Sequence, residues 1–154
     1  MLAGILLFAA VAGESADRVV VNKAKRELVL LRGGKVLRSY RVALGREPVG
    51  AKQRQGDGRT PEGSYTISGR NPKSAFHLSL RISYPSAADR ERARREGVDP
   101  GGDIMIHGLP NGQGSLGALH RVRDWTEGCI AVTDAEIEEI WKLVANGTPV
   151  EIRP

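Results

Sequence analysis

The chain has 154 residues, which suits one domain with its own hydrophobic core and is short for two. Its composition, 40% hydrophobic and 27% charged, excludes a disordered tail and a polytopic membrane protein, and its single cysteine excludes a disulfide scaffold. The net charge of +5 suits an anionic partner and is also compatible with ordinary solubility.

The first residues have the pattern of a targeting segment. Residues 2–12 form an uncharged apolar run of 11 residues, shorter than the ~20 that a membrane-spanning helix needs. The run ends in Ala10-Val11-Ala12, as at a signal-peptide cleavage site. Because no Lys or Arg precedes it, a misassigned start, a buried strand and an uncleaved anchor are alternatives. We expect residues 1–16 to be a signal peptide or N-terminal targeting segment, and residues 17–154 to form a domain in the periplasm or cell envelope, with no stable membrane span after signal removal.

Short apolar segments between turn residues predict a domain built mainly of β-strands. Gly33-Gly34 supplies the positive φ that a tight hairpin needs. Residues 45–62 lose the apolar alternation and are expected to form a long loop, and a Gly-rich loop is expected over residues 109–117. The predicted strands are 18–22, 27–31, 35–43, 63–68, 76–84, 104–106, 129–132 and 149–152.

Two segments carry helix signals. Ser86 and Asp89 form a capping box that opens a basic segment, expected to be a solvent-exposed helix. Nucleic-acid binding is disfavoured there, because no aromatic residues are interleaved with the arginines. Thr133 and Glu136 form a second capping box before an amphipathic helix that ends at Asn146-Gly147. We predict one mostly β domain with mixed, β-sandwich-like sheets and one or two short α-helices.

The candidate chemistry centres on the one thiol. The three histidines are not paired in the sequence, so no metal site is predicted, and no nucleotide-binding loop or serine-nucleophile motif is present. A cysteine at the start of an apolar strand, like Cys129, is commonly a small buried hydrophobe. Gly128, however, would let a substrate approach, and its N–H with that of Cys129 could face an oxyanion. A thiol with a pKa near 8.5 also needs a base, and His107 ends another predicted strand.

Three segments together resemble one protein family. Residues 56–65 (GDGRTPEGSY), 106–108 (IHG) and 126–130 (TEGCI) occur in the order found in the YkuD-type L,D-transpeptidase catalytic domain, and the resemblance extends over about residues 19–152. It implies the fold of that family. Its members are exported bacterial enzymes acting on peptidoglycan stem peptides. Their cysteine attacks an acyl group at a meso-diaminopimelate centre and passes it to an amine or to water, without a cofactor or metal. We expect a monomer.

The resemblance assigns roles residue by residue. Cys129 corresponds to the nucleophile and His107 to the proton donor and acceptor. Gly108 corresponds to the residue whose backbone carbonyl orients that imidazole. Thr126 and Gly128 correspond to the hydroxyl and the small residue that flank the nucleophile.

Two positions depart from the family pattern. Glu127 stands where many members have His, and Ala131 stands where many have Arg or Asn. The substrate carboxylate then needs another guanidinium group. We expect Arg123 or Arg121 to supply it, with Asp124 orienting that side chain.

The remaining candidates have structural alternatives. His120, nine residues before the cysteine, is the alternative base or a substrate contact on a polar loop. His77 is expected to be a hydrogen-bonded strand histidine. Tyr84 and Trp125 are expected to pack or to line a pocket, and Tyr84 is a candidate substrate contact. The basic loop at residues 52–54 is the alternative site for the substrate carboxylate.

The sequence leaves several functions open. The first hypothesis is a cysteine-dependent peptidoglycan enzyme that performs L,D-transpeptidation; an L,D-carboxypeptidase, or an amidase that cleaves diaminopimelate–lipoprotein linkages, would use the same residues. The second is a non-catalytic peptidoglycan-binding module, and the third is a thiol protein that forms mixed disulfides. The presence of both Cys129 and His107 favours the enzyme.

Overall fold

The computed structural model describes residues 14–154. The apolar run and cleavage pattern of the signal-peptide prediction, residues 2–12, lie outside the described residues. Ala16, expected to precede the domain, is already packed against it: it is 5% exposed, and its N–H donates to the Leu143 carbonyl at 2.8 Å. Within the described range, no helix is both long enough and apolar enough to cross a bilayer.

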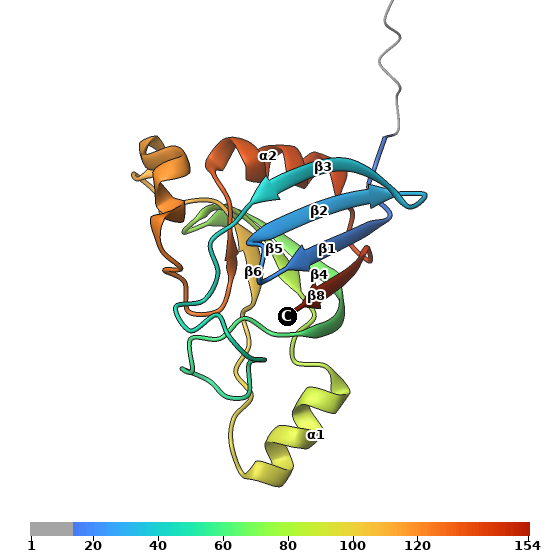
Figure 1. Cartoon of the computed structure of the whole chain (residues 1–154), viewed down its shortest axis with the longest axis vertical. Coiled ribbons are helices and arrows are strands. Elements are labelled where there is room, and N and C mark those ends of the chain that lie inside the picture. Colours follow the sequence, from blue (N-terminus) through green and yellow to red (C-terminus); the bar gives the residue numbers. More distant parts are fainter. Residues whose placement is uncertain (1–13) are drawn as a thin grey trace, which may run out of the picture.

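The described chain forms one mixed sheet of eight strands. The strands are β1 (Arg18–Asn22), β2 (Glu27–Arg32), β3 (Lys35–Arg41), β4 (Gly63–Ser74), β5 (His77–Ile82), β6 (Met105–His107), β7 (Ile130–Ala131) and β8 (Pro149–Arg153). Their order across the sheet is β3-β2-β1-β8-β4-β5-β6-β7 (Figure 1). Neighbours are antiparallel except for the parallel pairs β1–β8 and β6–β7. The predicted fold class, mostly β with short helices, is confirmed.

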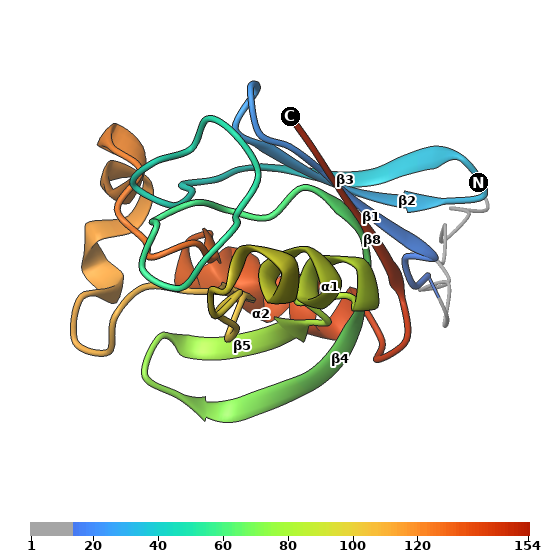
Figure 2. The ribbon, with the colours of Figure 1, turned by 90° about the horizontal axis from the view of Figure 1, so that it is seen from below.

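The long strand β4 joins the two halves of the sheet. Its residues 63–66 pair with β8, and its later residues pair with β5. Two register shifts interrupt the pairing with β5, and such irregularities bend a strand. Figure 2 shows β4 curving from β8 towards β5. The sequence pattern ended this strand at residue 68, because residues 69–74 lack apolar alternation and are held in the sheet by their partner strand.

Both helices begin at the predicted capping boxes. In α1 (Ala87–Glu96) and α2 (Asp134–Leu143), the cap hydroxyl accepts the N–H of the third helical residue, whose carboxylate bonds back to the cap. α2 packs against β5 and β6 and buries Ile137 and Ile140 completely. It ends at Leu143, before the predicted end at residue 146. Figure 1 places α1 at the opposite end of the domain from α2.

The inner face of α1 is not simply solvated. Asp89 is 8% exposed and accepts the Tyr65 hydroxyl at 2.8 Å and the Arg92 guanidinium at 3.1 Å. Arg92 also donates to the Lys52 carbonyl at 3.2 Å. α1 therefore fastens one side of the loop over residues 45–62.

The segment after β6 also differs from the prediction. Instead of an open Gly-rich loop over residues 109–117, residues Gly114–Val122 form a 3-10 helix, η1, which is kinked at Gly117. This segment contains Gly114 and Gly117, so its sequence resembles a loop, and short 3-10 turns commonly serve as connectors.

Candidate active site

The long loop over residues 45–62 supports the segment that carries the cysteine. The Arg46 N–H donates to the Thr126 carbonyl at 2.9 Å, and the Thr126 N–H donates to the Leu44 carbonyl at 3.2 Å. Thr60 is fully buried, and its hydroxyl accepts the Gly45 N–H at 3.0 Å. The Thr-Pro-Glu-Gly segment therefore acts on the site through the backbone that it positions.

Two charged residues fix the shape of this loop. Lys23 is 2% exposed; it donates to two loop carbonyls at 2.9 and 2.7 Å and pairs with Glu62 at 3.0 Å. Asp57 accepts the Lys52 ammonium at 2.9 Å and three backbone N–H groups. Burial acts to raise the pKa of Asp57, but these donors outweigh it and lower the pKa to about 2.

Thr126 and Gly128 shape the turn before the cysteine. The Thr126 hydroxyl donates to the Cys129 carbonyl at 2.7 Å and accepts the Gly128 N–H at 3.1 Å. Gly128 has a φ of 142°, and a Cβ there would lie 2.7 Å from the Arg59 carbonyl oxygen, so the position requires glycine. The expectation that the Gly128 N–H faces an oxyanion is wrong for this structure, because Thr126 already accepts that N–H. Of the two N–H groups predicted to face an oxyanion, that of Cys129 remains a candidate.

Cys129 lies in a polar cavity of about 440 Å³. Its Sγ donates to the Asp103 carbonyl at 3.3 Å. Burial raises the pKa of the Cys129 thiol, and a hydrogen bond from the Met105 backbone opposes that shift. The thiol is therefore protonated at neutral pH, and an attack on an acyl group requires a base. The cavity wall includes Lys52, Asp99, Asp103, Ile104 and Glu127.

His107 has the properties of that base. It is 2% exposed, and its Nδ1 lies 2.7 Å from the Gly108 carbonyl oxygen. Because a carbonyl only accepts, Nδ1 carries the proton and Nε2 keeps its lone pair. Burial lowers the pKa of His107 to about 4, so the imidazole is neutral at pH 7. The Phe76 ring stacks on the imidazole with centroids 4.3 Å apart, and the Phe76 carbonyl accepts the Gly108 N–H at 3.0 Å.

Strands β6 and β7 bring the histidine and the cysteine to one face of the sheet. The two strands are parallel, with Ile106 opposite Ile130 and His107 opposite Ala131. Cys129 immediately precedes β7, two positions before Ala131, so the alternation of the strand, continued by one residue, places its side chain on the same side as that of His107. In this structure the thiol proton is directed to the Asp103 carbonyl and not to the imidazole.

The two departures from the family pattern do not bind a carboxylate in this structure. Glu127 is exposed at the cavity of the cysteine and forms an ion pair with Arg46. Ala131 is fully buried in β7. The charge of Glu127 beside the thiol is thus partly neutralised. Neither position carries a cationic side chain that could bind a substrate carboxylate.

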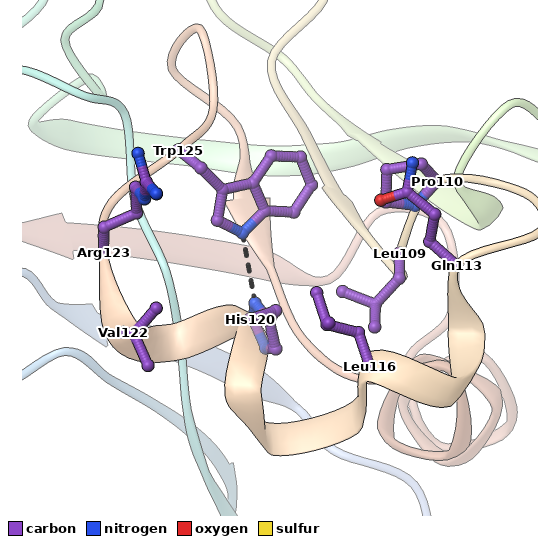
Figure 3. A pocket seen from close by; sticks show the side chains of 8 residues that line it. All are labelled: Leu109, Pro110, Gln113, Leu116, His120, Val122, Arg123 and Trp125. Carbon is purple, nitrogen blue, oxygen red and sulfur yellow. Dashed lines mark hydrogen bonds between the residues drawn. The ribbon is translucent and has the colours of Figure 1, made fainter.

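The predicted arginines separate into one paired and one open residue. Arg121 lies 3.4 Å from Glu136. Arg123 lines a second cavity with Trp125 (Figure 3) and forms no ion pair within residues 14–154. The expectation that Asp124 orients one of them is wrong, because Asp124 pairs with Arg26 at 2.9 Å.

The other expected substrate contacts have structural positions. His120 is 4% exposed, and its Nδ1 accepts the Trp125 indole N–H at 3.2 Å, so it does not lie on an open polar loop. Tyr84 is 5% exposed and donates to the Pro100 carbonyl at 2.7 Å, which makes it a packing residue rather than a substrate contact. His77 lies on the surface, with Nε2 2.8 Å from the Glu138 carboxylate.

The sequence did not reveal two contributors to the site. Phe76 lies in the turn between β4 and β5 and stacks on His107, and no short-range pattern links the two residues. Asp103 presents its carbonyl to the thiol with a φ of 54°, unusual for a non-glycine residue. Its place after Gly101-Gly102 was the one available signal. No group of three or more His, Cys, Asp or Glu side chains suited to a metal ion occurs within residues 14–154.

Comparisons with known proteins agree with this arrangement. The family model of the YkuD L,D-transpeptidase catalytic domain matches residues 16–152. The putative L,D-transpeptidase YafK of Escherichia coli K12 is 32% identical over 115 residues, which cover 72% of this chain and 38% of that protein. This chain therefore spans well under half of the curated relative that it matches.

Solved structures give the same result. The helical cell shape determining protein Pgp2 of Campylobacter jejuni superposes with a TM-score of 0.66 at 25% identity, over 88% of this chain and 46% of Pgp2. The L,D-transpeptidase LdtMt1, in a complex with imipenem, has the same fold, with a TM-score of 0.56 at 16% identity over 88% of this chain and 57% of its own. The fold, the family match over nearly all of the described residues and the sequence relatives together show that this chain belongs to the L,D-transpeptidase catalytic domain family.

Proposed function

We propose that this chain is an exported, cysteine-dependent peptidoglycan enzyme that performs L,D-transpeptidation on the stem peptide at meso-diaminopimelate. The observation that carries the proposal is the placement of His107 at the end of β6 and of Cys129 immediately before the parallel neighbour β7, with a protonated thiol in an open cavity and a neutral imidazole whose Nε2 lone pair is free. Family membership supports peptidoglycan as the substrate. The Pgp2 structure is that of a protein that determines cell shape, as expected for an enzyme of the wall.

The reaction would begin when Cys129 Sγ attacks the acyl carbon and its proton passes to His107 Nε2. The Gly108 carbonyl stabilises the resulting imidazolium through Nδ1–H, which lies 2.7 Å away. The Cys129 N–H is the donor that the turn leaves for the oxyanion. As the tetrahedral intermediate collapses, the carbon–nitrogen bond to the leaving residue breaks, and its amine takes the proton from His107.

The second half of the reaction would regenerate the thiol. An acceptor amine attacks the thioester and loses a proton to His107, and the departing Cys129 sulfur recovers that proton. Water in place of the amine would give carboxypeptidase chemistry with the same residues. Because the imidazole is neutral at rest, it can accept the first proton without prior deprotonation.

A covalent probe tests the nucleophile. The β-lactam ring of a carbapenem opens when it acylates a nucleophile, and the structure of LdtMt1 has been solved in a complex with imipenem. We expect imipenem to add once to the wild-type protein by intact-mass spectrometry and not to Cys129→Ala. An adduct that persists in Cys129→Ala would remove the cysteine from its proposed role.

The products of wall fragments test the reaction. After incubation of the protein with purified muropeptides, new cross-links between diaminopimelate residues are expected. If trimmed tetrapeptides are the sole product, the enzyme is a carboxypeptidase and not a transpeptidase. If release of a lysine-linked peptide is the sole product, it is an amidase. His107→Ala should lose most of the activity while remaining folded, since general acid–base assistance contributes about 10²–10⁴-fold. Cys129→Ala serves as the inactive control.

A further inference from the structure

A second cavity lies beside the catalytic histidine. It has a volume of about 290 Å³, at the small end of ligand pockets. It opens between η1 and the segments before and after it, as Figure 3 shows. Its walls are mostly apolar or aromatic, formed by Leu109, Pro110, Leu116, Val122 and Trp125.

The charge of this second cavity is positive. Arg123 is exposed at its edge, forms no ion pair within residues 14–154, and no carboxylate of the described chain lines the cavity. The cavity of Cys129 is instead lined by the carboxylates of Asp99, Asp103 and Glu127. Of these, Asp103 pairs with Arg81 and Glu127 pairs with Arg46. The lysine of this cavity, Lys52, is already bonded to Asp57. A carboxylate on the substrate is therefore matched by the second cavity, whereas the first offers it no unpaired cation.

Trp125 lies between the second cavity and His107. Its ring lies 5.9 Å from the His107 ring, centroid to centroid, and it forms part of the cavity wall. Its indole N–H donates to His120 Nδ1 at 3.2 Å, which holds the ring in place (Figure 3). One peptide can thus reach both the second cavity and the catalytic residues.

We propose that the second cavity binds the part of the stem peptide that precedes diaminopimelate, with the glutamate α-carboxylate on the Arg123 guanidinium and an alanine methyl group against Leu116 and Val122. The inference rests on the proposed function for the identity of the peptide. Its physical basis is independent of the cysteine chemistry: an unpaired guanidinium beside an apolar surface. Arg121, two residues earlier in the chain, cannot substitute, because Glu136 already pairs with it.

The kinetic test compares two peptides on three proteins. The peptides are a meso-diaminopimelate tetrapeptide stem with a free glutamate α-carboxyl and the same stem with that carboxyl amidated. We expect wild type to favour the free acid by about tenfold in kcat/KM, as an exposed charge-assisted hydrogen bond predicts, and Arg123→Gln to lose this preference. Arg90→Gln removes another exposed guanidinium, on α1, and should keep the preference for the free acid. The same preference in wild type and Arg123→Gln would overturn the proposal.

A binding test does not depend on turnover. In Cys129→Ala, addition of the free-acid stem should shift the NMR signal of the Trp125 indole N–H, assigned by its persistence in Trp141→Phe, since the chain has only two tryptophans. The same titration of a double variant that carries both Cys129→Ala and Arg123→Gln should give a much smaller shift. Backbone signals that saturate while the Trp125 signal stays in place would also overturn the proposal.

The two proposals fail in distinguishable ways. An Arg123-dependent shift of the Trp125 signal, in a protein that forms no imipenem adduct and no products, keeps this binding site and removes the proposed enzyme. Turnover of the stem with no dependence on Arg123 keeps the enzyme and removes this site.

Discussion

Acidification provides a direct test of the neutral His107. Burial lowers its pKa from 6.5 to about 4, a difference worth about 3 kcal/mol between the protonated and neutral forms. The folded protein therefore binds fewer protons than the unfolded chain between these two pH values. The resulting stability is fully present above pH 6.5 and is lost as the pH falls towards 4. A His107→Gln variant has no such group to titrate.

Urea unfolding at several pH values from 7 to 4 measures this effect. The unfolding free energy of wild type should fall relative to that of His107→Gln by up to about 3 kcal/mol, because all other titrating groups are common to both proteins. If the unfolding free energies of wild type and His107→Gln instead differed by a constant amount across this pH range, the buried neutral imidazole would be refuted.

The rate of imipenem acylation reports the same group kinetically. At pH 5 an imidazole with a pKa of about 4 is still about nine-tenths neutral, whereas one with a pKa of 6.5 is only about 3% neutral. We expect the acylation rate of wild type to stay within about twofold between pH 7 and pH 5. An acidic limb centred near pH 6.5 would show that the base is solvated and would contradict the geometry around His107.

Two further substitutions test the support of the site. Asp57→Asn removes the negative charge that pairs with the buried Lys52 ammonium. The lowering of the Asp57 pKa from 3.8 to about 2 corresponds to about 2 kcal/mol, so the urea midpoint should fall at pH 7, and the loss should shrink below pH 3.8. An unchanged midpoint at pH 7 would mean that the loop does not depend on this carboxylate. Gly128→Ala places a Cβ 2.7 Å from the Arg59 carbonyl oxygen at a φ of 142°, so imipenem acylation should fall by more than tenfold even where circular dichroism shows a folded protein. Wild-type acylation in Gly128→Ala would show that the turn tolerates displacement.

The sequence by itself determined the elements whose signals are local. The hairpin at Gly33-Gly34 and the capping boxes at Ser86 and Thr133 depend on residues within a few positions of one another, and each forms where it was predicted. The order of three short motifs was also enough to identify the family, because each motif is local. Element ends were less accurate, since β4 continues to Ser74 through pairing with β5.

Only the tertiary structure decided how the site is built. The stacking of Phe76 on His107, the hydrogen bond of the Cys129 thiol to Asp103 and the pairing of Asp124 with Arg26 join residues that are 26 to 98 positions apart or lie on different strands. Which arginine is left unpaired, Arg123 rather than Arg121, follows from the position of α2 against η1. No sequence spacing encodes such contacts, because they arise when the sheet brings distant segments together, and burial then sets the protonation states on which the chemistry depends.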